Sequence, residues 1–225
     1  MTLMRTVLLT CGFVLAVCDA AVAQPAAPSA SSNAAGKPML TLQMPALPDP
    51  VKVTLKPATT ALLISDMIDP TCKSQPKCTG VMLPAIAALL GQARKAGVLV
   101  AYATRGPSSS WLPEVAPAPG DPQTGSKAQD RFYDTELDKT LKAKGITTVI
   151  LTGWKINGSI LYTSIGATLR GYTVVIPVDA SLAAADFEVA IGLFQILNQN
   201  AANATNEPLK EKASTLSRTD MITFQ

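Results

Sequence analysis

The sequence predicts a single-domain, three-layer α/β/α fold with a mostly parallel, Rossmann-like sheet. Short apolar runs typical of buried strands alternate with amphipathic helical segments, and the connections between them are short. Alternation of this kind implies right-handed βαβ crossovers, which place helices on both faces of the sheet. The chain has 225 residues, and the roughly 200 that remain after an N-terminal leader suit one α/β domain.

The predicted elements follow one another in a regular order. Residues 51–56 alternate apolar and polar side chains, which is typical of an edge strand or a hairpin. Further strands are predicted from short apolar runs at 60–65, 98–104, 147–152, 173–178 and 221–224. Helices are predicted from apolar residues at helical spacing at 81–96, 135–144, 157–169 and 187–198.

A long loop rich in proline, glycine and serine is predicted between residues 105 and 131. Inside a compact domain, a loop of this length more often forms a lid or a binding element than filler. We therefore expect part of this loop to lie near a ligand site.

The N-terminus predicts export. Arg5 precedes an apolar run from Val7 to Val17, and Ala21-Val22-Ala23 is typical of a signal-peptide cleavage site. The expected organisation is a signal peptide at 1–23, a disordered or extended tether at 24–50 and the folded domain at 51–225. The mature protein is then periplasmic or secreted, with no membrane segment, since no second long apolar run follows.

The cysteines agree with export. Cys11 and Cys18 leave with the signal peptide, and Cys72 and Cys78 remain in a proline-containing loop. In an oxidising compartment this pair is expected to form a disulfide. A cysteine pair can also bind a metal ion, but the chain has no second pair and no histidine to complete four ligands.

The absence of histidine from the chain restricts its chemistry. It excludes Ser-His-Asp and Cys-His catalytic sites and histidine-ligated zinc or iron. Catalysis has to use carboxylates, lysine, serine, tyrosine or backbone dipoles, and we expect no metal and no other cofactor. A net charge of +3 is too small and too dispersed to indicate nucleic acid. The expected partner is a small-molecule substrate or ligand, and homo-oligomer formation stays open.

The predicted strand ends carry the residues of a candidate site. Ligands of parallel sheets lie beyond the carboxyl ends of the strands, where Asp66 and Gly153 each follow such a strand. The chain then enters a helix for which Asn157 is the expected N-cap, and Ser159 lies in its first turn, where N–H groups and the positive dipole end would stabilise a nucleophile or an anion. Simpler interpretations are a βα crossover whose serine helps to cap the helix, and a loop or capping carboxylate at Asp66.

Several segments together carry a family resemblance. Residues 61–67 (Ala-Leu-Leu-Ile-Ser-Asp-Met) form a strand that ends in Asp-Met, and residues 119–121 and 132–137 follow the next predicted strand. Two further strands occupy 145–153 and 171–180. The order and spacing of these segments, over roughly residues 60–198, resemble the isochorismatase-like, or cysteine hydrolase, superfamily. The resemblance implies an isochorismatase-like fold and hydrolysis of a small molecule.

The family's catalytic residues carry over unevenly. Asp66 matches the catalytic aspartate of the family, and Ser159 stands where the family has its cysteine nucleophile. The catalytic lysine lies six residues before the phenylalanine matched by Phe132, which places Ser126 at that position and Lys127 one residue away. Because one residue reverses the direction of a side chain in an extended segment, Lys127 is either the lysine after a local shift or a solvated surface residue.

The resemblance also implies a cis peptide bond at Trp154–Lys155, which would aim backbone N–H groups at an oxyanion. Trp154, Lys155 and Asn157 would then line a substrate-binding pocket; otherwise Lys155 is a surface charge and Asn157 a helix cap. The metal-binding nicotinamidase branch has histidine ligands that this chain cannot supply.

With serine in place of cysteine, three functions stay open. Hydrolysis of an amide-type C–N bond would need a base for the serine hydroxyl, either Asp66 or a neutral Lys127. Hydrolysis of a vinyl ether, the reaction of true isochorismatases, would use Asp66 as proton donor and acceptor, with Ser159 as a pocket residue. The third is a catalytically inactive relative that binds a small molecule.

Overall fold

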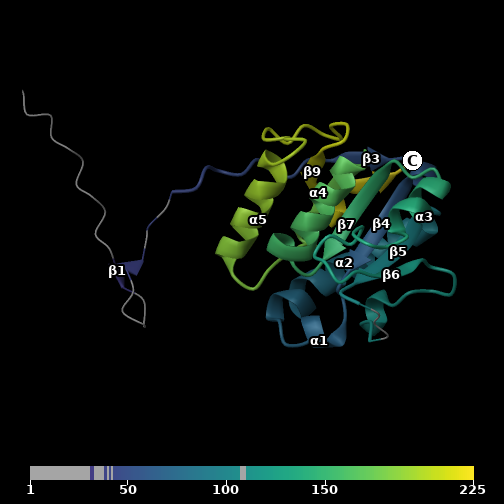
Figure 1. Ribbon diagram of the computed structural model, residues 1–225, viewed down its shortest axis with the longest axis horizontal. Helices are drawn as coiled ribbons and strands as arrows, with labels where there is room; N and C mark the ends of the chain where they lie inside the picture. The colour runs from purple at the N-terminus through teal and green to yellow at the C-terminus, as the bar shows by residue number, and fades with distance from the viewer. Residues whose placement is uncertain (1–30, 33–37, 40, 42, 107–109) are drawn as a thin grey trace, which may run out of the picture. The chain divides into compact units, whose positions relative to one another are not determined.

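The structure is a computed structural model that describes residues 31–32, 38–39, 41, 43–106 and 110–225 (Figure 1). The predicted signal peptide at 1–23 lies outside the described residues. The chain divides into two units, Met1–Pro45 and Ala46–Gln225. In the first unit, the two-residue strands β1 (Ser31–Ser32) and β2 (Pro38–Met39) pair antiparallel.

The second unit is built on a six-stranded sheet in the order β6-β5-β4-β7-β8-β9. Its strands are β4 (Thr60–Ser65), β5 (Leu99–Thr104), β6 (Gln123–Gly125), β7 (Thr148–Gly153), β8 (Thr173–Pro177) and β9 (Ser214–Ser217). Every neighbouring pair is parallel, which confirms the predicted sheet. Ser65, at the end of β4, lies opposite Ala103 of β5 and Gly153 of β7. The residues that follow these three strands therefore meet at one edge of the sheet.

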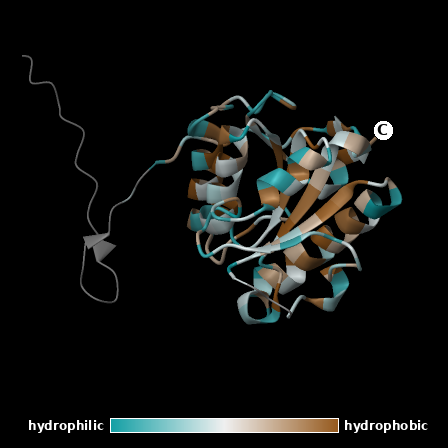
Figure 2. Cartoon of the chain, turned by 45° about the vertical axis from the view of Figure 1, so that its right-hand side comes forward, coloured by the Kyte–Doolittle hydropathy of each residue, from teal (hydrophilic) through white to brown (hydrophobic). Residues whose placement is uncertain are grey.

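Helices cover both faces of this sheet, as predicted (Figure 1). The helices are α1 (Asp69–Cys72), α2 (Leu83–Lys95), α3 (Leu137–Ala143), α4 (Leu161–Leu169) and α5 (Asp186–Asn198). Side chains of β4 alternate between the faces: Leu62 and Ile64 pack with α2, whereas Ala61 and Leu63 pack with α3, α4 and α5. Figure 2 shows the strands as mostly hydrophobic between these helices. Such strands need an apolar residue at nearly every position, which explains the continuous apolar runs in the sequence.

Short elements complete the second unit. The predicted strand at 51–56 is β3 (Val53–Leu55), which pairs in parallel with β10 (Ile222–Phe224) in a separate two-stranded sheet. Single 3-10 turns lie at Pro57–Thr59, Pro113–Val115 and Thr219–Met221, and π-helical turns at Cys78–Met82 and Ile156–Ile160. Among the described residues, no helix is long and apolar enough to cross a membrane.

In the second unit, β6, β9 and α1 were not predicted from the sequence. β6 (Gln-Thr-Gly) is three residues long and polar because it is the edge strand of the sheet. β9 (Ser-Thr-Leu-Ser) is fully buried in spite of its hydroxyl groups, because these find backbone acceptors. The Thr215 hydroxyl donates to the Glu207 carbonyl at 3.1 Å, and the Ser217 hydroxyl to the Val51 carbonyl at 2.8 Å. Polar strands of this kind give no apolar run to detect.

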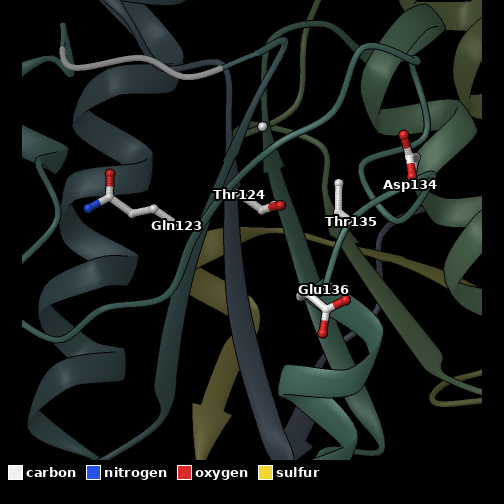
Figure 3. A pocket seen from close by; sticks show the side chains of 6 residues that line it. Gln123, Thr124, Asp134, Thr135 and Glu136 are labelled. Atoms are coloured by element: carbon white, nitrogen blue, oxygen red, sulfur yellow. The ribbon is translucent and has the colours of Figure 1, made fainter.

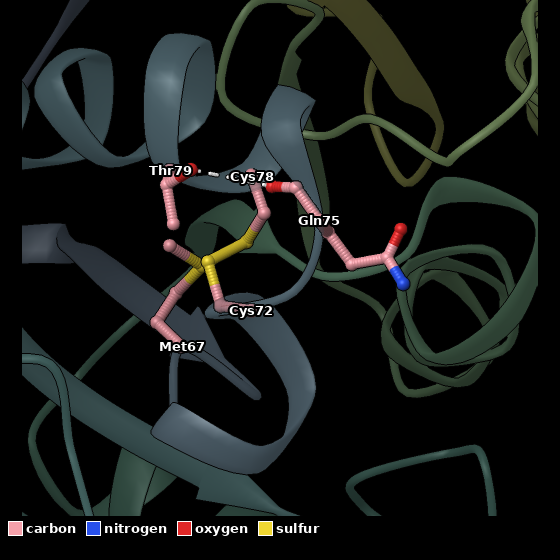
Figure 4. Close-up of a disulfide and its surroundings, with 5 residues drawn as sticks. All are labelled: Met67, Cys72, Gln75, Cys78 and Thr79. Carbon is pink, nitrogen blue, oxygen red and sulfur yellow. Dashed lines mark hydrogen bonds between the residues drawn. A yellow bond between two sulfur atoms is a disulfide. The ribbon is translucent and has the colours of Figure 1, made fainter.

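The predicted disulfide between Cys72 and Cys78 is present, with the two Cα atoms 5.4 Å apart. Figure 4 shows it packed beside Met67, whose sulfur lies 4.0 Å from the Cys78 sulfur. Met67 directly follows Asp66, so the disulfide packs against the segment that follows the end of β4. The same loop is tied to the start of α5 by an ion pair of 2.5 Å between Lys77 and Asp186.

Candidate active site

Asp66 lies at the carboxyl end of β4 and is only 5% exposed. Its backbone is left-handed, with φ of 57°, and its N–H donates to the Ala103 carbonyl at 3.0 Å. One carboxylate oxygen, Oδ1, accepts from the Arg105 N–H at 3.2 Å, and the other, Oδ2, accepts from Arg131 Nη2 at 2.5 Å. The carboxylate is therefore fixed from two sides, in an ion pair that is shielded from water.

The cation beside Asp66 is not the one that the sequence analysis favoured. Lys127 is exposed, and it does not line the cavity that contains Asp66. Ser126 is buried, with its hydroxyl oxygen 2.9 Å from the carbonyl oxygens of both Asp130 and Tyr133. The chain bends directly after Ser126, whose hydroxyl oxygen also accepts the Ala128 N–H at 3.2 Å, and Lys127 is left exposed to solvent in this bend. Arg131 could have been considered from the sequence, since Lys127 and Arg131 are the two cations between residues 126 and 136.

The turn after β7 carries the second half of the site. It begins at Gly153, and the Trp154–Lys155 peptide bond is cis, which confirms the expectation from the resemblance. Ser159 follows in the π-helical turn Ile156–Ile160; it is 2% exposed, and its hydroxyl donates to the Trp154 carbonyl at 2.9 Å. The serine hydroxyl is thus held within its own turn.

Asn157 is not an N-cap, because it lies inside the π-helical turn and no side-chain cap is made there. Its Nδ2 instead donates to Glu188 of α5 at 3.2 Å, and the same Oε1 atom accepts from Lys155 Nζ at 2.7 Å. The other oxygen of Glu188 accepts from the Ala185 N–H at 3.2 Å. Glu188 therefore fastens the turn that carries Ser159 to the start of α5.

These contacts lower the pKa of Glu188 from about 4.5 to about 2, chiefly through the hydrogen bond from Lys155 and then through those from the Ala185 N–H and from Asn157. A carboxyl group whose pKa is lowered in the folded state stabilises that state above its unfolded pKa. We expect this contribution to be complete above pH 4.5 and to disappear as the pH falls towards 2.

Glu188→Gln should therefore lower the free energy of unfolding at pH 6, and the difference from wild type should shrink between pH 4.5 and pH 2. Urea unfolding at several pH values measures this difference. Glu211→Gln, which changes an exposed carboxylate outside the cavity, is the control. A difference that stays constant over this pH range would contradict the assignment of Glu188.

Asp66 and Ser159 line one cavity of about 240 Å³. Its walls are formed by Asp66, Thr71, Arg105, Gln129, Arg131, Trp154, Lys155, Gly158 and Ser159. Four of the predicted site residues thus line the cavity: Asp66, Trp154, Lys155 and Ser159. Asn157 does not line it, but donates to Glu188, which also accepts a hydrogen bond from Lys155. Thr71, Gln129, Gly158 and the two arginines were not predicted. Within the described part of the chain, no group of three or more His, Cys, Asp or Glu side chains could hold a metal ion.

A second cavity, of about 530 Å³, lies between the edge strand β6 and the start of α3. Figure 3 shows Thr124 of β6 facing the segment that carries Asp134, Thr135 and Glu136. This cavity contains none of the predicted site residues, and no cation lines it. Although it is larger, it lacks a buried reactive group, so the cavity at Asp66 is the candidate active site.

Comparison with known proteins agrees with this geometry. The profile of the isochorismatase domain matches residues 60–207, which include every residue that lines the cavity at Asp66. The chain belongs to the isochorismatase family. This is a family of hydrolases that act on small molecules, and its fold explains why the site lies at the carboxyl ends of β4 and β7.

Solved structures of the isochorismatase family share the fold. N-carbamoylsarcosine amidase from Thermoplasma acidophilum superposes with a TM-score of 0.59 at 22% identity, covering 72% of this chain and 97% of that one. An isochorismatase family protein from Burkholderia thailandensis gives 0.62 at 20% identity, covering 76% and 96%. A cysteine hydrolase from Pseudomonas syringae pv. phaseolicola gives 0.60 at 20% identity, covering 80% and 95%. At these identities the likeness concerns the fold alone.

A curated relative of the chain is the ureidoacrylate amidohydrolase RutB of Methylobacterium radiotolerans. It is 36% identical over 67 residues, which are 30% of this chain and 26% of the relative. The match thus spans about a quarter of that relative's length, so its activity does not transfer directly to this chain.

Proposed function

We propose that this chain hydrolyses a small molecule in the cavity at Asp66, at an amide-type C–N bond or a vinyl ether. Asp66 transfers the proton, and Ser159 occupies the nucleophile position. The observation that carries the proposal is the buried carboxylate of Asp66, which shares one cavity with the Ser159 turn. A buried carboxylate in a cleft is the kind of group that general acid–base chemistry uses.

In the amide route, the Ser159 hydroxyl attacks the carbonyl carbon. The hydroxyl proton, which is now donated to the Trp154 carbonyl, passes to Asp66 and then to the leaving nitrogen. Backbone N–H groups of the turn that follows the Trp154–Lys155 bond bind the oxyanion that forms. The Trp154 N–H is not among them, because it donates to the Ser65 carbonyl at 3.1 Å. Water then releases the acyl group by the reverse sequence of proton transfers.

In the vinyl-ether route no nucleophilic side chain is required. Asp66 donates a proton to the substrate carbon and recovers one from the water that adds. Ser159 then acts only as part of the cavity wall. The same residues support both routes. The two routes differ in whether the Ser159 hydroxyl forms a covalent bond with the substrate.

A catalytically inactive, small-molecule-binding relative is the second candidate, and two observations favour it. The Ser159 hydroxyl is engaged by the Trp154 carbonyl, and both oxygens of Asp66 already accept hydrogen bonds. Arginine, unlike lysine, does not release a proton at ordinary pH, so Arg131 cannot act as a base for the serine.

The choice of substrates follows the names of the relatives. N-carbamoylsarcosine and ureidoacrylate are the substrates named for two of them, so the first panel consists of small amides and ureides, with enol ethers added for the second route. Wild type and Ser159→Cys are compared on this panel, with thermal shifts recorded for each compound.

The amide route predicts that Ser159→Cys increases amide hydrolysis, because a thiol ionises far more readily than a hydroxyl. Under the vinyl-ether route, existing activity stays unchanged in Ser159→Cys. If neither protein hydrolyses any compound while some compounds raise the melting temperature, the binding protein replaces the hydrolase proposal.

We also propose that the protein is exported, with a mature chain that begins near Gln24. The proposal rests on the predicted signal peptide and on the disulfide, a bond that persists in oxidising compartments. Intact-mass measurement of protein from the periplasm or medium should give the mass from Gln24 onward and rise by about two daltons on reduction. A full-length mass in the cytoplasmic fraction alone would contradict export.

A further inference from the structure

We propose that Arg131 is the catalytic cation of this site, in place of the lysine that the family resemblance expects at Ser126. Its guanidinium positions Asp66, and its Nε–H donates to an oxygen atom of the bound molecule. The inference rests on the proposed function and adds a charged side-chain donor to the backbone N–H groups that are proposed there to bind the reacting oxygen.

The guanidinium of Arg131 is held in place from several sides. Nη2 donates to Asp66 Oδ2 at 2.5 Å, and Nη1 donates to the Ala128 carbonyl at 2.8 Å. Its backbone N–H donates to the Thr163 hydroxyl of α4 at 3.1 Å. With 2% of the residue exposed, the side chain has little freedom to move, and a preorganised donor binds a developing charge without reorganising.

The Nε–H of Arg131 has no hydrogen-bond partner in the part of the chain that the structure describes, although it is buried. An unsatisfied buried donor destabilises a protein, and such groups in native structures call for an explanation. Because Arg131 lines the cavity beside Asp66 and Ser159, an oxygen of a ligand in this cavity would complete its hydrogen bonding. Carbonyl and oxyanion oxygens are suitable acceptors for this donor.

No other cation of the same segment reaches Asp66. The hydroxyl of Ser126 is turned toward backbone carbonyls, and Lys127 is exposed. The cation beside Asp66 is therefore Arg131, five residues after the position at which the resemblance places the lysine. Since arginine keeps its proton, proton transfer is assigned to Asp66 and not to Arg131.

Kinetic measurements on Arg131→Gln and Arg131→Lys test the role. With a substrate from the panel, Arg131→Gln should lower kcat by ~100-fold or more, the loss typical of one oxyanion donor, with a smaller change in KM. Arg131→Lys keeps a charged donor and should retain kcat to within ~10-fold. Arg94 forms an ion pair of 2.7 Å with Asp121 outside the cavity, so Arg94→Gln and Arg94→Lys are the matched controls, expected within ~3-fold of wild type.

A kcat that survives in Arg131→Gln, or a loss in Arg131→Lys as large as in Arg131→Gln, would overturn the proposal. The first outcome would mean that no donor is needed at this position. The second would mean that the arginine is required for its shape and packing, which is a structural role.

A second measurement does not depend on activity. Arg131→Gln leaves the buried charge of Asp66 unpaired and should lower the melting temperature by about 10 °C. The double variant Asp66→Asn/Arg131→Gln should lose at least ~5 °C less than the sum of the two single variants. Additive losses would show that the two groups are not paired and would overturn the assignment whether or not the protein is active.

The two proposals can fail separately. If wild type hydrolyses nothing in the panel but the pair is coupled, the hydrolase proposal fails. The Nε–H is then tested by binding: a panel compound that raises the melting temperature of wild type should also raise that of Arg131→Lys and leave Arg131→Gln unchanged. Equal shifts in all three proteins would overturn the donor role of Arg131.

Discussion

Asp66→Asn should lower turnover by at least ~100-fold, because both catalytic routes require a carboxylate to move a proton and asparagine keeps the shape without the basicity. Asp179→Asn is a matched control, since Asp179 follows β8, another strand of the same sheet, and accepts hydrogen bonds from Thr219 outside the cavity. Initial rates on the panel, with melting temperatures recorded for each variant, separate loss of activity from loss of folding.

Ser159→Ala distinguishes the two routes in the same assay. It should lower turnover as much as Asp66→Asn if the hydroxyl forms a covalent bond, and only several-fold if Ser159 is part of the cavity wall. Turnover that stays near the wild-type level in Asp66→Asn would mean that the reaction takes place elsewhere in the molecule.

Gly153→Ala should lower the stability of the protein by more than about 4 kcal/mol, which is exceptional for one methyl group. Gly153 has φ of 123°, a conformation that side chains rarely adopt, and an added Cβ would lie 1.8 Å from the Ser65 carbonyl oxygen. That carbonyl accepts the Trp154 N–H at 3.1 Å. The methyl group would therefore push apart the ends of β4 and β7, which carry Asp66 and the Ser159 turn.

Gly171→Ala is the control for the backbone conformation alone. Gly171 also has positive φ, +90°, but nothing lies within 4 Å of its added Cβ. The expected loss is about 1–2 kcal/mol, the cost of a left-handed residue with a side chain. Urea unfolding of both variants measures the difference in stability. Equal losses of stability would show that the contact with Ser65 does not contribute to the effect of Gly153→Ala.

The parts of the fold that could be predicted are those in which the chain repeats a pattern locally. The short, mostly apolar run at 60–65 is typical of a strand buried on both faces, and the structure has it as β4 with the same bounds. Because β4 and β7 are neighbours in a parallel sheet, the meeting of Asp66 and Ser159 also followed from the sequence.

The parts that could not be predicted depend on contacts between distant and irregular segments. Arg131 pairs with a residue 65 positions away, from a loop without periodicity, so nothing near it in the sequence indicates its partner. Glu188 likewise reaches the site from another helix, α5, and at the start of a helix an acidic residue is ordinary. In both cases the type of side chain was known from the sequence, whereas its position in the fold and its partner could not be predicted.

The disulfide has a practical consequence for any study of this protein. Cys72 directly follows Thr71, a cavity residue, and Cys78 touches Met67, the neighbour of Asp66. One covalent link therefore lies next to two residues that line the cavity, Asp66 and Thr71. Protein produced where thiols stay reduced would lack this link, and its kinetics would describe a looser site. Oxidised and reduced samples should be treated as two different proteins, and every assay should state which of them was used.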